Sequence, residues 1–145
     1  MSVGLLLITH GGIGAELLEA ATRMLGVCPL QAQALAVENG DDPAQLGRRA
    51  RACVRELEAG EGVLVLTDLF GSTPANVASD LCDLGNTRIL SGVNLPMVVR
   101  VLNYPQLSLD ALVDKALSGA RDGVFQCPAA GCVVGSTGSV HGPRH

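Results

Sequence analysis

The residues best suited to chemistry in this chain are a histidine and an aspartate that each closely follow an apolar run. His10 comes after the run Val3–Ile8, and Asp68 comes after the run Gly62–Thr67. If the two runs are neighbouring strands of a parallel sheet, their carboxyl ends meet at one edge and the two side chains lie together. A carboxylate that accepts a hydrogen bond from Nδ1–H fixes the imidazole tautomer and leaves the Nε2 lone pair available as a nucleophile or a proton acceptor. The pair therefore predicts a histidine that can take up a phosphoryl group.

The loop after Asp68 supplies groups that can hold an anion. Gly71 permits close approach of the backbone, and Ser72 and Thr73 place hydroxyls and amides at the start of a helix, where unpaired N–H groups and the helix dipole favour negative charge. Because phosphoryl transfer depends mainly on positioning and charge stabilisation, we expect this cradle to suffice without a metal or another cofactor. Each residue taken alone is also ordinary turn and cap chemistry, so the prediction rests on the whole set.

The elements that must position these residues alternate along the chain. Segments typical of strands lie at residues 3–8, 32–37, 62–67 and 87–90. Helical spacing and cap signals predict helices that include residues 17–25, 43–57, a segment opened by Ser72-Thr73-Pro74, a segment that ends near Leu102, and residues 109–117. We therefore expect an α/β fold with a doubly wound, mainly parallel sheet of order 2-1-3-4 and helices on both faces. In such sheets the site lies at the carboxyl ends of the strands, here the loops Thr9–Gly12, Asp68–Thr73 and Ser91–Asn94.

The sequence predicts one folded domain followed by a C-terminal tail. We expect one domain over residues 1–128, because the length and the apolar share of 48% suit a single core. Gly123–Cys127 is a candidate for a short last strand at an antiparallel edge. The tail over residues 129–145 is rich in Gly, Ser and Pro and lacks periodicity, so we expect it to be flexible and dispensable, with His141 and His145 in solvent.

Composition excludes several classes of function. Ten basic against fourteen acidic residues give a formal charge of −4, and the arginines are scattered, so a nucleic-acid partner is disfavoured. The arginines between Arg48 and Arg55 fall on the polar side of a predicted helix, which indicates a solvated face rather than an anion site. The apolar run at the N-terminus stops at Thr9 and has no basic region before it, so we expect a cytoplasmic protein.

The cysteines predict neither disulfides nor a metal site. Five cysteines form no CxxC pair, and the odd count argues against a disulfide framework. Cys127 and Cys132 have no second ligand pair to complete a tetrahedral site, so a structural role is expected for them.

Three motifs together point to a family. They are Thr9-His10-Gly11, the run Thr67-Asp68-Leu69-Phe70-Gly71-Ser72-Thr73-Pro74-Ala75-Asn76, and Gly92-Val93-Asn94-Leu95-Pro96-Met97. Each follows a predicted strand. In this order they resemble the EIIA component of the mannose/fructose-type bacterial sugar phosphotransferase system (PTS), and the resemblance covers about residues 1–127.

The resemblance implies a phosphocarrier. His10 would take a phosphoryl group from the phosphocarrier protein HPr and donate it to an EIIB partner, with Asp68 orienting the imidazole. It also implies a homodimer in which the last short strand pairs across subunits. The chain leaves no room for an EIIB domain, so we expect the acceptor on another chain, or a regulatory role read from the phosphorylation state. Association with a membrane would then be at most indirect, through the transporter complex.

One position departs from the family's pattern. Ser72 stands where the family often has a second glycine before Ser/Thr-Pro. The sequence leaves open whether the Ser72 side chain or only its amide faces the phosphoryl group.

A hydrolase is the main alternative. His10, Asp68 and Ser72 have the residue types of a nucleophilic triad. However, Ser72 does not lie in the GxSxG elbow that exposes a nucleophile above such a sheet.

A nucleotide-binding or flavin-binding module is the second alternative, because of the expected fold. Neither GxxxxGK[ST] nor a complete GxGxxG occurs in the chain. Gly12-Ile13-Gly14 is followed by Leu17 at the place where the third glycine is needed.

Overall fold

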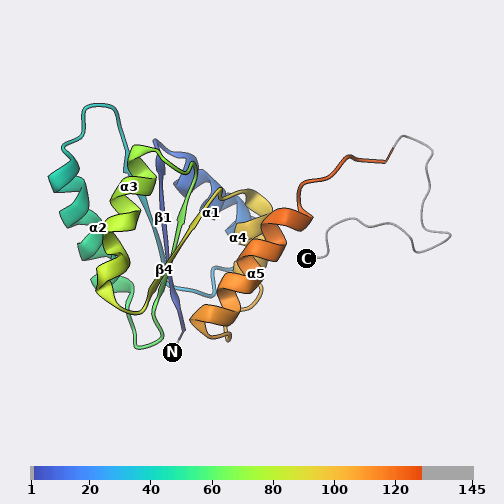
Figure 1. Cartoon of the computed structure of the whole chain (residues 1–145). Helices are drawn as coiled ribbons and strands as arrows, with labels where there is room; N and C mark the ends of the chain where they lie inside the picture. Colours follow the sequence, from blue (N-terminus) through green and yellow to red (C-terminus); the bar gives the residue numbers. More distant parts are fainter. Residues whose placement is uncertain (1, 129–145) are drawn as a thin grey trace.

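Four parallel strands form a central sheet between two layers of helices in the computed structural model, which describes residues 2–128 (Figure 1). The strands are β1 (Gly4–His10), β2 (Ala32–Val37), β3 (Val63–Thr67) and β4 (Thr87–Ser91). The helices are α1 (Ile13–Leu25), α2 (Pro43–Leu57), α3 (Thr73–Ser79), the 3-10 helix η1 (Asp80–Leu84), α4 (Leu95–Leu102) and α5 (Leu109–Asp122). The sheet order is β2-β1-β3-β4, so the predicted α/β fold and strand order are confirmed.

Two apolar clusters, one on each face, hold the helices to the sheet. The cluster on one face joins the strands to α1, α4 and α5, and the cluster on the other face joins them to α2, α3 and η1. Figure 1 shows these two groups of helices on opposite sides of the strands. The side chains of β3 and those of β1 before His10 are buried on both faces. This explains why the sequences of both strands are continuous apolar runs rather than alternating ones.

Side-chain caps define where several helices begin. Asp42 Oδ1 accepts a hydrogen bond from the Ala44 amide at 3.3 Å, and Pro43 occupies the first position of α2. Asn94 Oδ1 accepts from the Met97 amide at 2.9 Å at the start of α4. These starts agree with the cap signals in the sequence.

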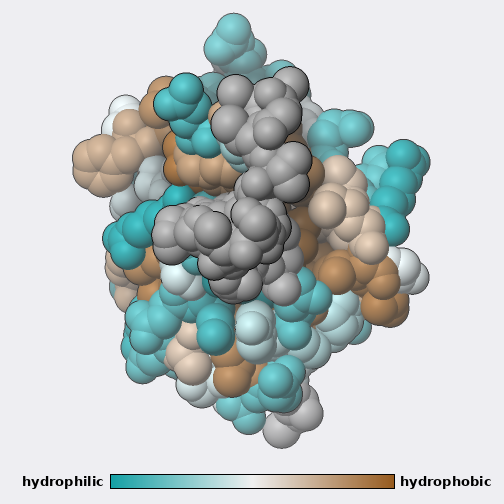
Figure 2. Space-filling view, turned by 90° about the vertical axis from the view of Figure 1, so that its right-hand side faces the viewer, coloured by the Kyte–Doolittle hydropathy of each residue, from teal (hydrophilic) through white to brown (hydrophobic). Residues whose placement is uncertain are grey.

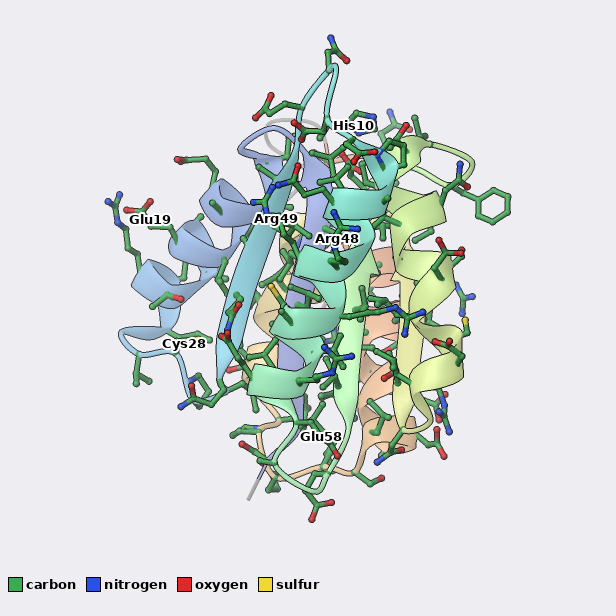
Figure 3. All side chains as sticks on the ribbon, turned by 90° about the vertical axis from the view of Figure 1, so that its left-hand side faces the viewer. His10, Glu19, Cys28, Arg48, Arg49 and Glu58 are labelled. Atoms are coloured by element: carbon green, nitrogen blue, oxygen red, sulfur yellow. The ribbon has the colours of Figure 1, made fainter. Side chains whose placement is uncertain are left out.

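The arginines of α2 lie on its outer side, as predicted. Figure 3 labels Arg48 and Arg49 there, and both are exposed, as is Arg55. Arg51 differs, because its guanidinium donates to the Asp80 carbonyl at 3.0 Å and to the Asp83 carboxylate at 3.1 Å. It thereby ties α2 to η1.

The structure differs from the sequence prediction at the C-terminal end of the domain. The candidate strand at Gly123–Cys127 is not formed, because a strand needs a hydrogen-bonded neighbour and none among residues 2–128 pairs with this segment. The predictions for the tail, including Cys132, His141 and His145, lie outside the described residues. Within the described part of the chain, no helix is both long enough and apolar enough to cross a membrane.

Helices α4 and α5 pack closely because Gly119 of α5 and Gly123, directly after it, leave room for α4. A Cβ placed on Gly119 would lie 2.5 Å from Cβ of Arg100, and one on Gly123 would lie 2.4 Å from Cβ of Pro96. A Cβ of the opposing helix is fixed by its backbone, so it cannot rotate away from such a contact. By contrast, a Cβ on Gly47 of α2 would meet no atom within 4 Å.

We therefore expect opposite effects from the same substitution in these two helices. Gly119→Ala should lower the free energy of unfolding by about 1–2 kcal/mol, because overpacking outweighs the gain of about 1 kcal/mol in helix propensity. Gly47→Ala, the matched control, should raise it by about 0.5–1 kcal/mol. Urea denaturation of both variants checks this, and a Gly119→Ala protein as stable as Gly47→Ala would contradict the packing argument.

Candidate functional site

His10 and Asp68 come together at the carboxyl edge of the sheet. His10 is the last residue of β1, and Asp68 directly follows β3, whose last residue Thr67 pairs with Ile8. One carboxylate oxygen, Asp68 Oδ2, lies 2.9 Å from His10 Nδ1 and accepts the His10 backbone N–H at 3.0 Å. Parallel pairing of the two strands thus brings together residues 58 positions apart in the sequence.

The charge state of Asp68 determines the tautomer of the imidazole. Burial would raise the pKa of Asp68, but hydrogen bonds from the side chain and the backbone amide of His10 outweigh it, so the pKa lies below its usual value. At neutral pH the carboxylate is therefore ionised and can only accept, which makes Nδ1 the protonated ring nitrogen. The Nε2 lone pair is then free for a nucleophilic attack.

The ring is open to an incoming group, whereas its partner is shielded. The His10 side chain is 48% exposed and the Asp68 side chain only 12%. Side chains alternate along a strand, and Leu6 and Ile8 both pack in the cluster under α2 and α3. His10 therefore points to the same side, toward the ends of these two helices.

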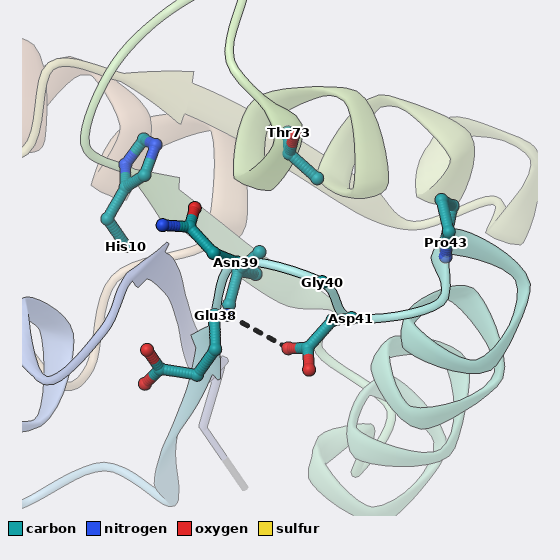
Figure 4. Close-up of a pocket in the computed structure, with 8 residues that line it drawn as sticks. His10, Glu38, Asn39, Gly40, Asp41, Pro43 and Thr73 are labelled. Atoms are coloured by element: carbon teal, nitrogen blue, oxygen red, sulfur yellow. Dashed lines mark hydrogen bonds between the residues drawn. The ribbon is translucent and has the colours of Figure 1, made fainter.

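A hollow of about 180 Å³ opens on that side (Figure 4). Its lining residues are His10, Val37, Glu38, Asn39, Gly40, Asp41, Pro43 and Thr73. The turn after β2 supplies four of these eight residues, and it is not among the loops that the sequence predicts to form the site. The sequence does contain a signal for this turn, because it follows the end of β2 at the same edge of the sheet as His10, where ligand sites form.

The three residues predicted to form an anion cradle occupy different places. Thr73 lines the hollow with His10. Ser72 does not, because its hydroxyl and its amide, the latter at 3.3 Å, both donate to the Leu69 carbonyl. Gly71 has a φ of +83°, and a Cβ added there would meet no atom within 4 Å, so the turn requires glycine for its left-handed backbone and not for space.

The loop after His10 is held by its neighbours. The Thr9 hydroxyl accepts the Gly14 N–H at 2.7 Å, and the Gly11 N–H donates to the Val37 carbonyl at 2.9 Å. The third predicted loop, Ser91–Asn94, does not line the hollow and has a structural role. Asn94 caps α4 and donates from Nδ2 to the Ala120 carbonyl at 3.2 Å, which ties the loop to α5.

The arrangement does not support the hydrolase alternative. A serine nucleophile needs a hydrogen bond to its base. Ser72 is bonded to Leu69, and among the described residues no hydrogen bond joins Ser72 to His10. Within residues 2–128 there is also no cluster of three or more His, Cys, Asp or Glu side chains suited to a metal ion.

A family model and a curated relative both match most of this chain. The family model EIIA-man, described as the PTS system fructose IIA component, matches residues 4–117. The PTS system mannose-specific EIIAB component of Escherichia coli (strain K12) is 31% identical over 127 residues, which make up 86% of this chain and 39% of that protein. The chain thus spans about two fifths of the length of this curated relative.

Solved structures resemble the whole domain. The mannose/sorbose specific IIA subunit of the phosphotransferase system from Enterococcus faecalis superposes with a TM-score of 0.78 at 26% identity, covering 89% of this chain and 97% of that chain. The PTS IIA protein associated with the fucose utilization operon from Streptococcus pneumoniae gives 0.74 at 25% identity, covering 87% and 96%.

The lowered pKa of Asp68 predicts how acid affects the site. The carboxylate contributes stability that is present above the unfolded-state pKa of about 4 and is lost as the pH falls through the lower folded-state pKa. Asp68→Asn cannot titrate. The difference in unfolding free energy between wild type and Asp68→Asn should therefore be largest near neutral pH and shrink below about pH 4. Urea denaturation across this range measures it, and a difference that does not change with pH would contradict the hydrogen bonds assigned to the Asp68 carboxylate.

Proposed function

The chain belongs to the EIIA-man family of PTS IIA components, and from this premise we propose that it is a phosphocarrier whose His10 accepts a phosphoryl group and passes it on. The observation that carries the proposal is the hydrogen bond of 2.9 Å between His10 Nδ1 and Asp68 Oδ2. It leaves Nε2 as the ring nitrogen with a free lone pair, on a side chain that lines the hollow.

The chemistry requires only the residues already described. The Nε2 lone pair attacks the phosphorus of phospho-HPr and forms a P–N bond while the bond that joins the phosphoryl group to HPr breaks. The Nδ1 proton stays in its hydrogen bond, and the Asp68 carboxylate offsets the positive charge that the ring gains. Donation to an EIIB protein on another chain reverses these steps. Alternatively, the phosphorylation state itself serves as a regulatory signal.

The loop after Asp68 holds the transferred group in this proposal. Thr73 is the member that lines the hollow with His10, so its hydroxyl and amide are the donors we assign to the phosphoryl oxygens. Gly71 and Ser72 contribute by shaping the turn that presents Thr73, since the Ser72 donors are directed to Leu69.

Exposed apolar residues beside the site support a protein as the phosphoryl donor. Leu69 and Phe70 follow Asp68 directly and are 61% and 85% exposed. Large apolar side chains at the surface are typical of the anchors of protein interfaces. HPr and EIIB, the partners that the family implies, are the proteins we expect to cover them.

We also propose that the chain is a homodimer. β4 is an edge strand of the sheet, and Val124 and Phe125 beyond α5 are 74% and 47% exposed. Over the α5 side of the molecule, Figure 2 shows apolar side chains in separate patches among hydrophilic ones. The segment after α5, paired with a neighbour's sheet edge, is the contact we propose.

Light scattering tests the dimer. At micromolar concentration the wild-type chain should have twice the monomer mass, and Phe125→Asp should shift it toward the monomer because a charge cannot be buried there without a partner. A monomer mass for the wild type would remove this proposal without affecting the role of His10.

Substitution of the pair tests the phosphocarrier directly. His10→Ala should abolish uptake of label from phospho-HPr while the fold stays intact, because the side chain is half exposed. Asp68→Asn should slow transfer by roughly tenfold to a hundredfold, the equivalent of a charge-assisted hydrogen bond of about 1.5–3 kcal/mol.

The chemical stability of the product separates this mechanism from a hydrolase. The label should be acid-labile and base-stable, as expected of a P–N bond, and no small product should be released. Uptake of label by His10→Ala would refute the proposed acceptor. Unchanged kinetics in Asp68→Asn would refute only the role of Asp68.

A further inference from the structure

The turn between β2 and α2 lies across the hollow from His10, and hydrogen bonds within the turn hold its conformation. Asp41 Oδ2 accepts the Glu38 N–H at 2.8 Å, and the Asp41 N–H donates to the Glu38 carbonyl at 3.2 Å. Gly40 supplies the left-handed backbone that the turn needs, with a φ of +88°. Asn39 therefore sits at a fixed position on the rim of the hollow.

The side chain of Asn39 is directed into the hollow and has no partner among the described residues. It lines the hollow together with His10 and Thr73, and Figure 4 shows its carboxamide extending toward the His10 ring. Within residues 2–128 the carboxamide makes no hydrogen bond, so both of its N–H donors are available.

The two acidic residues of the turn that line the hollow, Glu38 and Asp41, are turned away from the ring or engaged in the turn. Figure 4 shows the Glu38 carboxylate on the far side of the turn from Thr73, and Gly11 lies next to it. Asp41 uses an oxygen to close the turn. The lining includes no lysine or arginine from the described part of the chain, so neutral donors are the groups that these residues offer to an anion there.

From this arrangement we propose that the Asn39 carboxamide donates a hydrogen bond to the phosphoryl group on His10 Nε2, opposite Thr73. The inference rests on the proposed function and assigns to Asn39 a role in binding the transferred group. A phosphoryl group has three acceptor oxygens, so donors on two sides of the hollow can bind different oxygens at once. The Asn39 donor should make the phosphohistidine longer-lived and its formation faster.

Chemical phosphorylation with phosphoramidate, a small P–N phosphoryl donor, tests the inference without any protein partner. The half-life of phospho-His10 is then followed by ³¹P NMR in wild type, Asn39→Ala and Asn39→Asp. Asn39→Ala should shorten it by about tenfold, which corresponds to the lower end of the range for one hydrogen bond to a charged group. Asn39→Asp has nearly the same shape but replaces the donor with a negative charge, so it should shorten the half-life further.

Gln45→Glu is the matched control, because it makes the same change from amide to carboxylate on α2, at a residue outside the lining of the hollow. It should leave the half-life within about twofold of wild type, and all variants should keep the wild-type urea midpoint. The same variants are then assayed with phospho-HPr.

The outcomes separate the two proposals. If Asn39→Ala and Asn39→Asp decay like wild type, the role of Asn39 is refuted while the phosphocarrier stands. If the wild type takes no label from HPr but its phosphoramidate product depends on Asn39, the assignment of HPr fails and the role of Asn39 stands. A chain that neither phosphoramidate nor phospho-HPr labels at His10 refutes both.

Discussion

The hydrogen bond between His10 Nδ1 and Asp68 Oδ2 is the interaction on which the rest of the site depends. It orients the ring, it selects the tautomer that leaves the Nε2 lone pair free, and it keeps a negative charge beside a ring that would become positive in the proposed phosphorylation. The same carboxylate oxygen also accepts the His10 backbone N–H, so the aspartate holds the strand end as well as the side chain. Neither residue is close to the other in sequence, and the parallel pairing of β1 with β3 is what joins them.

The sheet also decides what surrounds the nucleophile. Because side chains alternate along β1, His10 falls on the face covered by α2 and α3, and the turn that leads into α2 and the first residue of α3 line the hollow beside it. The loop that leads into α4 lies elsewhere and is used to tie α4 to α5 through Asn94. A shift of one residue in the register of β1 would turn His10 to the other face and break both relations.

Much of this could be predicted from the sequence, because the relevant signals are periodic or local. The strands β1 and β3 are apolar up to their carboxyl ends, β2 begins and ends at the predicted residues, and Asp42 and Asn94 stand at helix starts. The juxtaposition of His10 and Asp68 followed from the strand order. The position of Asn39 beside His10 could not be predicted from the strand order, because it depends on how an irregular turn folds over a neighbouring strand end. The direction of the Ser72 hydroxyl depends on a local turn that binds it to Leu69. Pairing of the segment after α5 depends on contacts outside its own sequence, and no strand among residues 2–128 pairs with it.

The ring nitrogen that carries the phosphoryl group reports directly on the role of the His10–Asp68 pair. The chain is labelled with ¹⁵N at histidine and phosphorylated with phosphoenolpyruvate, enzyme I and HPr, and the ring nitrogens are then observed by ¹⁵N and ³¹P NMR. We expect phosphorus to be coupled to Nε2 of His10 and Nδ1 to remain protonated. Phosphorus on Nδ1, or on a hydroxyl such as that of Thr73, would contradict the role assigned to the pair.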